Sequence, residues 1–598
     1  MCGIIGFVSA TKGIRPEVFN AMRDTMVHRG PDGMGSEFWK DGMVAFGHRR
    51  LSIIDLSNDG AQPMSNADQS IWLTFNGEIY NFQELKTFLE KKYTFHSGTD
   101  SEVLIYGYQE WGIEALLERI EGMFAFALYD TNKEEVFVAR DRVGIKPLHY
   151  FFKDGTLIFA SELKAIKAYP NFRPELNNDA LASYFRLRYI LAPLSIYKDC
   201  AKLLPGHYAV FNQQSGELCT KCYYSLQNQI KTTNEDEDAL VQKIRLALEE
   251  SVQAQTVAAD VPVHTFLSGG IDSSTITALV KKFNDQLSAY SIEVLDDVKN
   301  EIEDARFVAK YLKVPLIEEQ LTGKDFTSLH NEIIAAYDEP LADTSCIPTY
   351  FLCQLTAQHV KVALSGDGGD ELFYGYNWYD GYKANAENSE IPFESFINGM
   401  SNTFDEDLIK QLFPNVSTDY IKTLFLSKAK DKKIQAKNVH HYDFHTFMVD
   451  DILTKVDTAS MAHSLETRVP FLDRKVIELA FSIDWKKHYQ QGELKYLLKK
   501  VSENLLPSET LYKKKKGFSV PSIQWLDVHV EHNLLNGFAA KDKVWNVTAL
   551  KQILKGRLHQ EQKWLLYNFE RWYAIQFHGK HESLRPNVLR KIQFRLSK

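Results

Sequence analysis

The stretch HTFLSGGIDSSTITALVKKF, residues 264–283, contains a short apolar run, a loop with two adjacent glycines and a helical pattern. We predict that a strand ends at Leu267, that SGGIDSS turns the chain, and that a helix begins near Ser273. Glycines let backbone N–H groups approach a phosphate, and a helix N-terminus adds partial positive charge. Asp272 repels a phosphate by itself. Its expected partner is therefore a divalent cation such as Mg2+, which prefers a few carboxylates together with phosphate oxygens.

A second glycine-rich loop, LSGDGGDE at residues 364–371, follows the apolar run HVKVAL. A single loop of this kind is explained equally well as a tight strand-to-helix turn with an N-capping serine. Two of them favour a ligand site, because parallel sheets bind ligands beyond the C-terminal ends of their strands. Neither loop contains the G-K-[ST] of a Walker A motif, which disfavours an ordinary kinase or GTPase. We predict a phosphate-and-metal cradle in which Asp370 and Asp272 share one Mg2+.

The segments around these loops indicate a parallel α/β sheet. The runs VPVHTFL, LSAYSIEV, VPLIEEQ and HVKVAL are short and mostly apolar, and they alternate with helical stretches. Before the first run, Leu240, Ile244, Leu248 and Val252 recur every four residues, as on one face of a helix. Residues from about 385 to 575 are mainly helical in pattern.

The first 224 residues have a different pattern. Short apolar runs such as SIWLTFNGEIYN, GMFAFALYD and GTLIFASE are separated by turn residues and indicate β-rich layers. The clearest helical stretches there are ELKTFLEKK and EVLIYGYQEWGIEALLERI. Residues 225–238 lose apolar content, as a linker does. We expect domains at 2–224 and 239–575, joined by that linker, and a basic tail at 576–598.

Composition limits the class of protein. The 598 residues, 44% hydrophobic and 25% charged, are typical of a globular enzyme with more than one domain. A net charge of −9 argues against nucleic acid as the main partner. No apolar run has the length of a membrane span and the N-terminus lacks a signal-peptide pattern, so we expect a cytosolic protein. Cys219 and Cys222 form a lone C-x2-C and are interpreted as reduced structural thiols.

Motifs along nearly the whole chain resemble known families. SGGIDSS resembles the pyrophosphate loop of the ATP pyrophosphatases, while MCGIIGF, VHRGPDG, RRLSIID, FNGEIYN and SGTDSEV resemble the class II glutamine amidotransferase domain. In this order, followed by LETRVPFLD and GELKYLLKK, they are similar to the glutamine-hydrolysing asparagine synthetases. The resemblance implies an α+β N-terminal nucleophile domain, an αββα sandwich, followed by an α/β parallel-sheet ATP pyrophosphatase domain with a helical C-terminal region.

The resemblance implies a glutamine site in the first domain. Once Met1 is removed, the α-amine of Cys2, with a reference pKa of about 7.7–8.0, suits a general base beside a thiol nucleophile. Asn76 and the Gly77 N–H match the family's oxyanion hole, which places donors where negative charge develops. Arg50 aligns with the residue that holds the α-carboxylate of glutamine. The other implied contacts are Leu51, Ile53, Ile54, Glu78 and Asp100, of which the two acids hold the α-ammonium.

In the second domain the resemblance implies an ATP site, so that the implied cofactors are ATP and Mg2+. Lys495 aligns with the family lysine that stabilises the triphosphate and the departing pyrophosphate, the alternative being a solvated helix lysine. Glu301 occupies an acidic position near the pyrophosphate in relatives. The implied ATP contacts are Phe266, Leu267, Ser268, Gly269, Gly270, Asp272, Ser273, Ser274, Ile292, Ser365 and Gly366.

The acceptor of the new amide is the open question. Relatives usually have a glutamate, thought to accept a proton from ammonia, where this chain has the shorter Asp367. The acceptor segment YDEPLADTSCIP contains no arginine or lysine to hold the α-carboxylate of aspartate, which leaves Arg468 as the candidate from elsewhere. We expect an ATP-dependent ligase that makes asparagine from aspartate and glutamine. A uronic acid of a surface-sugar precursor is the alternative acceptor, a non-catalytic sensor of glutamine or ATP is a remote alternative, and a homodimer is left open.

Overall fold

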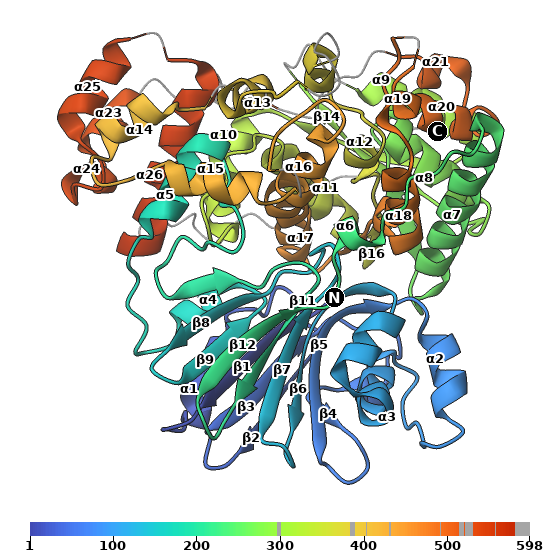
Figure 1. The fold of residues 1–598 in the computed structure, drawn as a ribbon, viewed down its shortest axis with the longest axis vertical. Coiled ribbons are helices and arrows are strands. Elements are labelled where there is room, and N and C mark those ends of the chain that lie inside the picture. Colours follow the sequence, from blue (N-terminus) through green and yellow to red (C-terminus); the bar gives the residue numbers. More distant parts are fainter. Residues whose placement is uncertain are drawn as a thin grey trace.

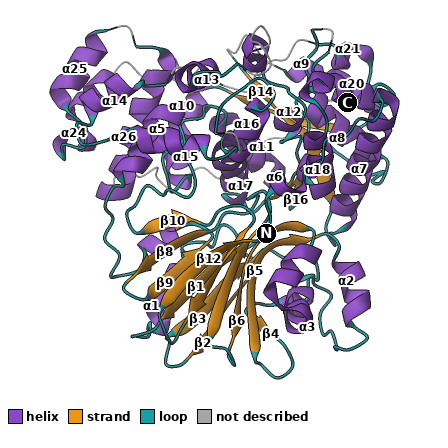
Figure 2. Cartoon of the chain, in the orientation of Figure 1, coloured by secondary structure: helices purple, strands orange, loops and turns teal. Residues whose placement is uncertain are grey.

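The computed structural model describes residues 1–295, 301–382, 389–401, 403–429, 432–490, 492–513, 520, 530–556 and 558–579. Figure 1 shows two bodies: a β-rich one formed by the N-terminal part of the chain and a larger one, rich in helices, formed by the rest. The N-terminus lies where the two bodies meet (Figure 1). Coloured by secondary structure, the strands fill most of the first body, whereas helices surround the few strands of the second (Figure 2).

The first body is a sandwich of two antiparallel sheets. Its strands are β1 (Gly3–Ser9), β2 (Gly33–Trp39), β3 (Val44–Arg50), β4 (Met64–Ser65), β5 (Ile71–Ile79), β6 (Gly122–Asp130), β7 (Glu135–Arg140), β8 (His149–Lys153), β9 (Thr156–Ala160), β10 (Cys200–Lys202), β11 (His207–Asn212) and β12 (Glu217–Cys222). The strand orders are β10-β8-β9-β1-β3-β2 and β12-β11-β7-β6-β5-β4. Val8, Phe46 and Tyr129 belong to a buried cluster that both sheets contribute to.

Helices cover the outer faces of this sandwich. They are α1 (Pro16–Asp24), α2 (Phe82–Leu89), α3 (Ser101–Arg119) and α4 (Leu163–Lys167). Helix α5 (Asn178–Leu187) lies instead among the helices of the second body (Figure 1). Helix α3 packs on β5, while α1 packs on β3 and α4 on β9. Both helices expected in this part of the chain are present, and α3 is interrupted at Gly112, whose φ of 75° favours glycine. The arrangement is the expected αββα sandwich.

The second body is built on one parallel sheet. Its strands are β13 (Val263–Phe266), β14 (Ala289–Val294), β15 (Leu316–Leu321), β16 (Val362–Leu364) and β17 (Glu466–Arg468), in the order β15-β14-β13-β16-β17. Every neighbouring pair is parallel. The four strands expected from the apolar runs are confirmed. The short β17, which sequence reasoning had treated only as part of a motif, places Arg468 beside Leu364 at the start of the second glycine-rich loop.

The rest of this body is mainly helical, as the helical pattern predicted. They are α6 (Leu226–Gln229), α7 (Glu237–Val257), α8 (Ile271–Lys281), α9 (Ile302–Leu312), α10 (Gly323–Ala336), α11 (Cys346–Ala357), α12 (Gly369–Leu372), α13 (Phe393–Met400), α14 (Glu406–Leu412), α15 (Asp419–Leu426), α16 (Val439–His445), α17 (Thr454–Met461), α18 (Arg474–Ser482), α19 (Trp485–His488), α20 (Tyr496–Ser502), α21 (Ser508–Leu511), α23 (Val530–Asn536), α24 (Phe538–Lys541), α25 (Val547–Lys555) and α26 (Gln560–His578). A π-helical turn, Met448–Leu453, runs directly into α17.

Helix α7 follows from its sequence. Asp236 caps its N-terminus by accepting a hydrogen bond from the Ala239 N–H, 2.8 Å away. The four apolar residues that recur every four positions, Leu240 to Val252, are all buried, as predicted. Within the described ranges, none of the helices combines the length and apolar character that a bilayer crossing requires. Most of the basic tail, residues 580–598, lies outside the described residues.

Candidate active sites

Cys2 lies immediately before β1, at the junction of the two bodies. It is buried, and burial raises the pKa of its thiol, while the nearby N-terminal charge, the Leu51 backbone and Arg50 lower it. Its N–H donates to Asn76 Oδ1 over 2.9 Å. Met1 precedes it, and the Met1 ammonium lies 3.0 Å from Glu466 Oε2. The thiol is therefore enclosed and surrounded by charged groups.

Strand β5 brings the predicted oxyanion donors next to Cys2. Asn76 is fully buried, and its Nδ2 has no hydrogen-bond partner among the described residues. A buried donor without a partner costs free energy unless a ligand satisfies it. A Cβ at Gly77 would lie 2.1 Å from the Met123 carbonyl oxygen on the neighbouring strand β6, so this position requires glycine. The geometry leaves amide hydrogens free for an anionic oxygen.

The other residues expected to bind glutamine surround the same point. Arg50 donates through Nη1 to the Ser57 carbonyl at 2.6 Å and through Nη2 to the Ile54 carbonyl at 3.4 Å. Asp100 accepts from the Ile79 N–H at 2.8 Å, and burial together with Glu466 raises its pKa to about 7. Leu51 and Ile53 are buried and Ile54 is half-buried, which gives the site an apolar wall.

One acid of this site, Glu78, forms an ion pair with the second body. Glu78 has its pKa raised well above the ordinary value by burial and by Asp100, against the effect of Arg468. Arg468, on β17, reaches Glu78 Oε2 with Nη2 at 3.1 Å and Glu466 Oε1 with Nε at 2.6 Å. Its third hydrogen bond goes to the Gln255 carbonyl at 2.6 Å. The second body thus supplies part of the wall of the first site.

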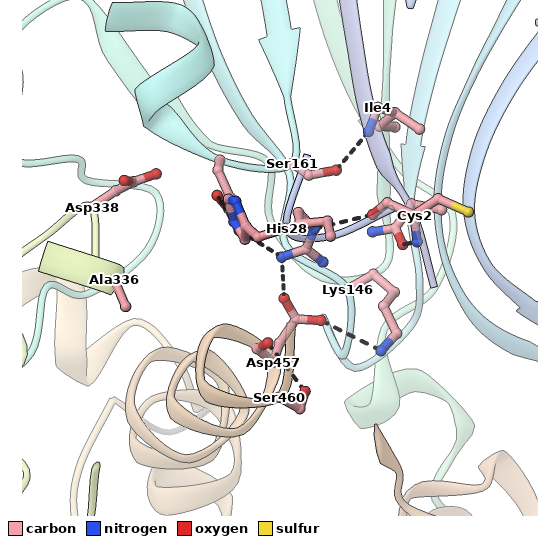
Figure 3. A network of polar contacts seen from close by, with 12 residues as sticks. Cys2, Ile4, His28, Lys146, Ser161, Ala336, Asp338, Asp457 and Ser460 are labelled. Atoms are coloured by element: carbon pink, nitrogen blue, oxygen red, sulfur yellow. Dashed lines mark hydrogen bonds and ion pairs between the residues drawn. The ribbon is translucent and has the colours of Figure 1, made fainter. Parts of the chain in front are cut away.

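A further ion network joins the bodies next to Cys2 (Figure 3). Arg29 donates through Nε to the Cys2 carbonyl at 3.0 Å and through Nη1 to both Glu162 and Asp457, each at 2.9 Å. Lys146 Nζ lies 3.5 Å from the other oxygen of Asp457. Asp457 belongs to α17 of the second body, so the cation that holds the Cys2 backbone is neutralised across the domain boundary.

The two glycine-rich loops open onto one cavity of about 670 Å³ in the second body. Gly269 has a φ of 80°, a left-handed conformation that favours glycine, and a Cβ there would lie 2.4 Å from the Asp304 backbone. Ser268 and Ser273 Oγ lie 3.0 Å apart across the loop. A Cβ at Gly366 would lie 2.6 Å from the Ser273 backbone nitrogen. The glycines therefore allow the two loops to touch.

The residues expected to hold the metal meet at one lysine. Lys495 Nζ contacts Asp272 and lies 2.5 Å from Asp370 Oδ1, and these two acids raise its pKa against the effect of burial. Both carboxylates therefore lie within reach of one shared cation, which fits a two-carboxylate Mg2+ site completed by phosphate oxygens. In the part of the chain that the structure describes, no group of three or more His, Cys, Asp or Glu side chains forms a metal site by itself.

All but one of the predicted ATP contacts line the cavity. Ser274 is fully buried in α8 and is not among the lining residues. The candidate cation for the acceptor, Arg468, does not line the cavity: its side chain is fully buried and pairs with Glu78 and Glu466, so the hypothesis that it reaches the acceptor is wrong. The predicted residues that do line the cavity are Phe266, Leu267, Ser268, Gly269, Gly270, Asp272, Ser273, Ile292, Glu301, Ser365, Gly366, Asp367, Asp370 and Lys495.

Sequence reasoning missed three cations of this cavity, Arg188, Lys455 and Lys499. Lys455 Nζ donates to Ser345 Oγ at 2.8 Å and lies 3.4 Å from Asp343 Oδ2, in the segment expected to bind the acceptor. Asp367 faces the same charges: burial raises its pKa, and Lys455 and Ser365 lower it. No local pattern marks Arg188 or Lys455, because their partners lie more than a hundred positions away.

Comparison with known proteins agrees with this architecture. A family model described as asparagine synthase matches residues 243–574, and one described as glutamine amidotransferase domain matches residues 1–224. The chain belongs to the asparagine synthase family. It is 33% identical to asparagine synthetase [glutamine-hydrolyzing] 1 of Bacillus subtilis, over 97% of this chain and 98% of the relative. It is 31% identical to a putative asparagine synthetase [glutamine-hydrolyzing] of Mycobacterium tuberculosis, over 96% and 97%.

Among solved structures, glutamine phosphoribosylpyrophosphate amidotransferase from Bacillus subtilis matches 53% of this chain and 65% of that one. The identity is 17% and the TM-score 0.29, and no argument rests on this similarity.

Proposed function

We propose that the chain is an ATP-dependent carbon–nitrogen ligase that makes asparagine, taking the amide nitrogen from glutamine. The observation that carries the proposal is the pairing of two sites in one chain. One is an enclosed thiol site in which the Asn76 amide has no partner. Arg468 and β17 join it to β16, the strand that ends in the second glycine-rich loop of an open cavity. We infer that residues 2–224 form the glutaminase domain and residues 239–575 the synthetase domain, joined by 225–238.

In the glutaminase site, the Cys2 sulfur attacks the side-chain carbonyl carbon of glutamine. The free α-amine of Cys2, exposed by loss of Met1, takes the thiol proton and passes it to the leaving nitrogen. Asn76 Nδ2 and the Gly77 N–H stabilise the oxygen that becomes negative. The carbon–nitrogen bond breaks to give ammonia and a thioester, which water hydrolyses to glutamate. Arg50 holds the α-carboxylate, while Glu78 and Asp100 hold the α-ammonium.

In the synthetase site, a carboxylate oxygen of aspartate attacks the α-phosphorus of ATP. The bond between the α-phosphorus and the bridging oxygen breaks, giving an acyl adenylate and pyrophosphate. The loop containing Ser268 and Gly270 and the loop containing Ser365 hold the phosphates through backbone N–H groups. Lys495 neutralises charge on the departing pyrophosphate. Bound Mg2+, held by Asp272 and Asp370, would supply further charge neutralisation of the triphosphate.

Ammonia from the first site then attacks the acyl carbon of the adenylate. The carbon–oxygen bond to AMP breaks, and Asp367 accepts the proton that the attacking nitrogen loses. Asp367 suits this role because it lines the cavity and burial raises its pKa, which makes it a stronger base than an exposed aspartate. A cytosolic location and a homodimer remain expectations, to be checked by fractionation and by light scattering.

The proposal is tested by acceptor-dependent pyrophosphate release with ATP, Mg2+ and glutamine. Aspartate at millimolar concentration should stimulate release and yield one asparagine per pyrophosphate. Stimulation by a nucleotide-linked uronic acid, with none by aspartate, would keep the ligase chemistry and replace the acceptor. ATP binding without any pyrophosphate release would instead favour a sensor.

A further inference from the structure

Arg188 sits at the C-terminal end of α5, in the half of the chain that matches the glutamine amidotransferase model, yet it lines the cavity of the other half. Its carbonyl accepts a hydrogen bond from the Ala342 N–H at 3.0 Å. Ala342 belongs to the acceptor segment YDEPLADTSCIP. The backbone of Arg188 is thus attached to the segment that was expected to hold the acceptor but contains no cation of its own.

The backbone conformation of Arg188 is unusual for its side chain. Its φ is 69° and its ψ 0°, a left-handed conformation that glycine adopts readily and that arginine adopts at a cost in free energy. Helices often end on a residue in this conformation, and that residue is usually glycine. Strained conformations of large residues are found most often at functional sites. The position therefore carries an arginine although the backbone alone favours glycine.

The guanidinium group of Arg188 is held from one side only. Nε lies 3.2 Å from Asp451 Oδ2, on the π-helical turn, and the group lies 5.1 Å from the centre of the Phe447 ring. Asp451 is fully buried and Arg188 is about one-fifth exposed, so the acid fixes the side chain while its outer end faces the cavity. The two terminal nitrogens make no hydrogen bond to any described residue.

The lysines that line the cavity already have carboxylate partners. Among the described lining residues, each lysine contacts a carboxylate, whereas the two terminal nitrogens of Arg188 are available to a ligand. The lysine pairs are Lys455 with Asp343, Lys495 with Asp272 and Asp370, Lys499 with Glu493, and Lys513 with Asp304. An arginine fork matches a carboxylate through two parallel hydrogen bonds, which makes it the preferred partner of a planar anion.

We propose that Arg188 binds the carboxylate of the acceptor that does not react, and so selects an amino dicarboxylate such as aspartate. The inference rests on the proposed function and names the specificity residue of its synthetase site. The reacting carboxylate then lies toward Lys455 and Asp367, which line the same cavity. A uronic acid linked to a nucleotide has only the carboxylate that reacts. It has no second carboxylate to pair with the Arg188 guanidinium, so Arg188 would not increase its affinity. The glutamine amidotransferase half of the chain thereby completes the acceptor site of the synthetase half.

The experiment compares Arg188→Gln with wild type in pyrophosphate release from ATP, Mg2+ and ammonium chloride, which bypasses glutamine. The KM for aspartate should rise about 10- to 100-fold, because a bidentate hydrogen bond to a charged group is lost. The KM for ATP and the glutaminase rate should stay within about twofold of wild type. An unchanged KM for aspartate, or a rise in the KM for ATP instead, would overturn the inference while leaving asparagine synthesis intact.

A second acceptor separates a positioning defect from a binding role. The probe is 3-aminopropanoate, which is aspartate without its α-carboxylate. Wild type should prefer aspartate in kcat/KM, and Arg188→Gln should reduce that preference about 10- to 100-fold. A variant that lowered both acceptors equally would show a purely structural arginine and refute the inference. A wild type that used a uronate and not aspartate would overturn both this inference and the proposed function.

Arg186, two residues earlier on α5, provides the matched control. It is fully buried and pairs with Glu394 and, at 3.1 Å, with Thr403 Oγ1, but it does not line the cavity. Arg186→Gln should lower the thermal midpoint and leave the KM for aspartate unchanged. If it raised that KM as much as Arg188→Gln does, the effect would come from displacement of the helix end, and the inference would fail.

Discussion

The thiol site and the ATP cavity differ in how far their charged side chains are buried. Around Cys2, the acids Glu78, Asp100 and Glu466 are almost completely buried, and Arg468 pairs with Glu466 and, across the domain boundary, with Glu78. The ATP cavity is open, and its acids Asp272 and Asp370 are about one-fifth exposed. A small enclosed site strengthens the electrostatic contacts around the reacting amide of glutamine, whereas a large nucleotide must enter the open cavity and pyrophosphate must leave it. The contrast indicates that glutamine chemistry depends on both bodies and ATP chemistry mainly on one.

The strongest test of this division is Cys2→Ala. Glutamine-dependent synthesis should fall by about three orders of magnitude or more, because the nucleophile is removed. Ammonium-dependent synthesis should continue near the wild-type rate, because the cavity is untouched. Asparagine formation from each nitrogen source is the measurement. Equal loss with both sources, in a protein with wild-type circular dichroism, would show that the sites are not separate.

The opposite variant is Asp272→Asn in the open cavity. Pyrophosphate release should fall by about 10²- to 10³-fold, because one of two carboxylates near the triphosphate loses its charge and Lys495 loses a partner. Glutaminase activity, followed as glutamate release, should persist. Asp285, an exposed acid at the end of a surface ion pair, supplies the control variant Asp285→Asn. Wild-type pyrophosphate formation in Asp272→Asn would remove this residue from the site.

Asp367 gives a pH test within the open cavity. Burial raises its pKa above the ordinary value of 3.8, so the base form is lost on acidification at a higher pH than for an exposed aspartate. Ammonium-dependent synthesis should therefore show an acid limb that Asp367→Asn abolishes, with a rate loss of about 100-fold. Asp367→Glu, which introduces the longer acid of relatives, should stay within about tenfold of wild type. A pH profile identical in wild type and Asp367→Asn would contradict a role as base.

The last pair of variants tests the boundary between the two bodies, where we expect changes in stability and not in catalytic rate. Arg468→Gln should destabilise the protein by about 3–5 kcal/mol, because it leaves buried Glu78 without its cation and removes one of the two cations that pair with Glu466. Arg474→Gln removes the 2.7 Å pair with Glu121 at the exposed edge of the same boundary and should cost less than about 1 kcal/mol. Urea unfolding followed by tryptophan fluorescence measures both. Similar losses for the two variants would show that burial does not set the strength of this boundary.

Local features were predictable from the sequence. The parallel strands followed from apolar runs, and the loops followed from glycines, because tight turns and close loop contacts exclude larger residues, as at Gly269 and Gly366. Asp272 and Asp370 lie in different loops, and they were recognised as partners because both loops follow strands of one sheet. Their shared contact with Lys495 agrees with that reasoning.

Features that join distant segments were not predictable. Arg188 and Asp451 are 263 positions apart, and Arg29 and Asp457 are 428 apart. The sequence contains many arginines and acids, and nothing local distinguishes the pairs that become buried. The same reasoning explains the error at Arg468: it was considered because the acceptor segment contains no cation, but its buried side chain pairs with Glu78, 390 positions away.

The contact between Arg29 and Asp457 has a consequence for recombination between relatives. A chimera that joined this N-terminal half to another family member's synthetase half would keep the arginine that holds the Cys2 carbonyl. If the donor lacked an acid at the matching point of α17, that arginine would lose one of its two counter-charges inside the protein. We therefore expect such a chimera to fold only when its N-terminal half supplies the arginine and its synthetase half supplies an acid at the position of Asp457.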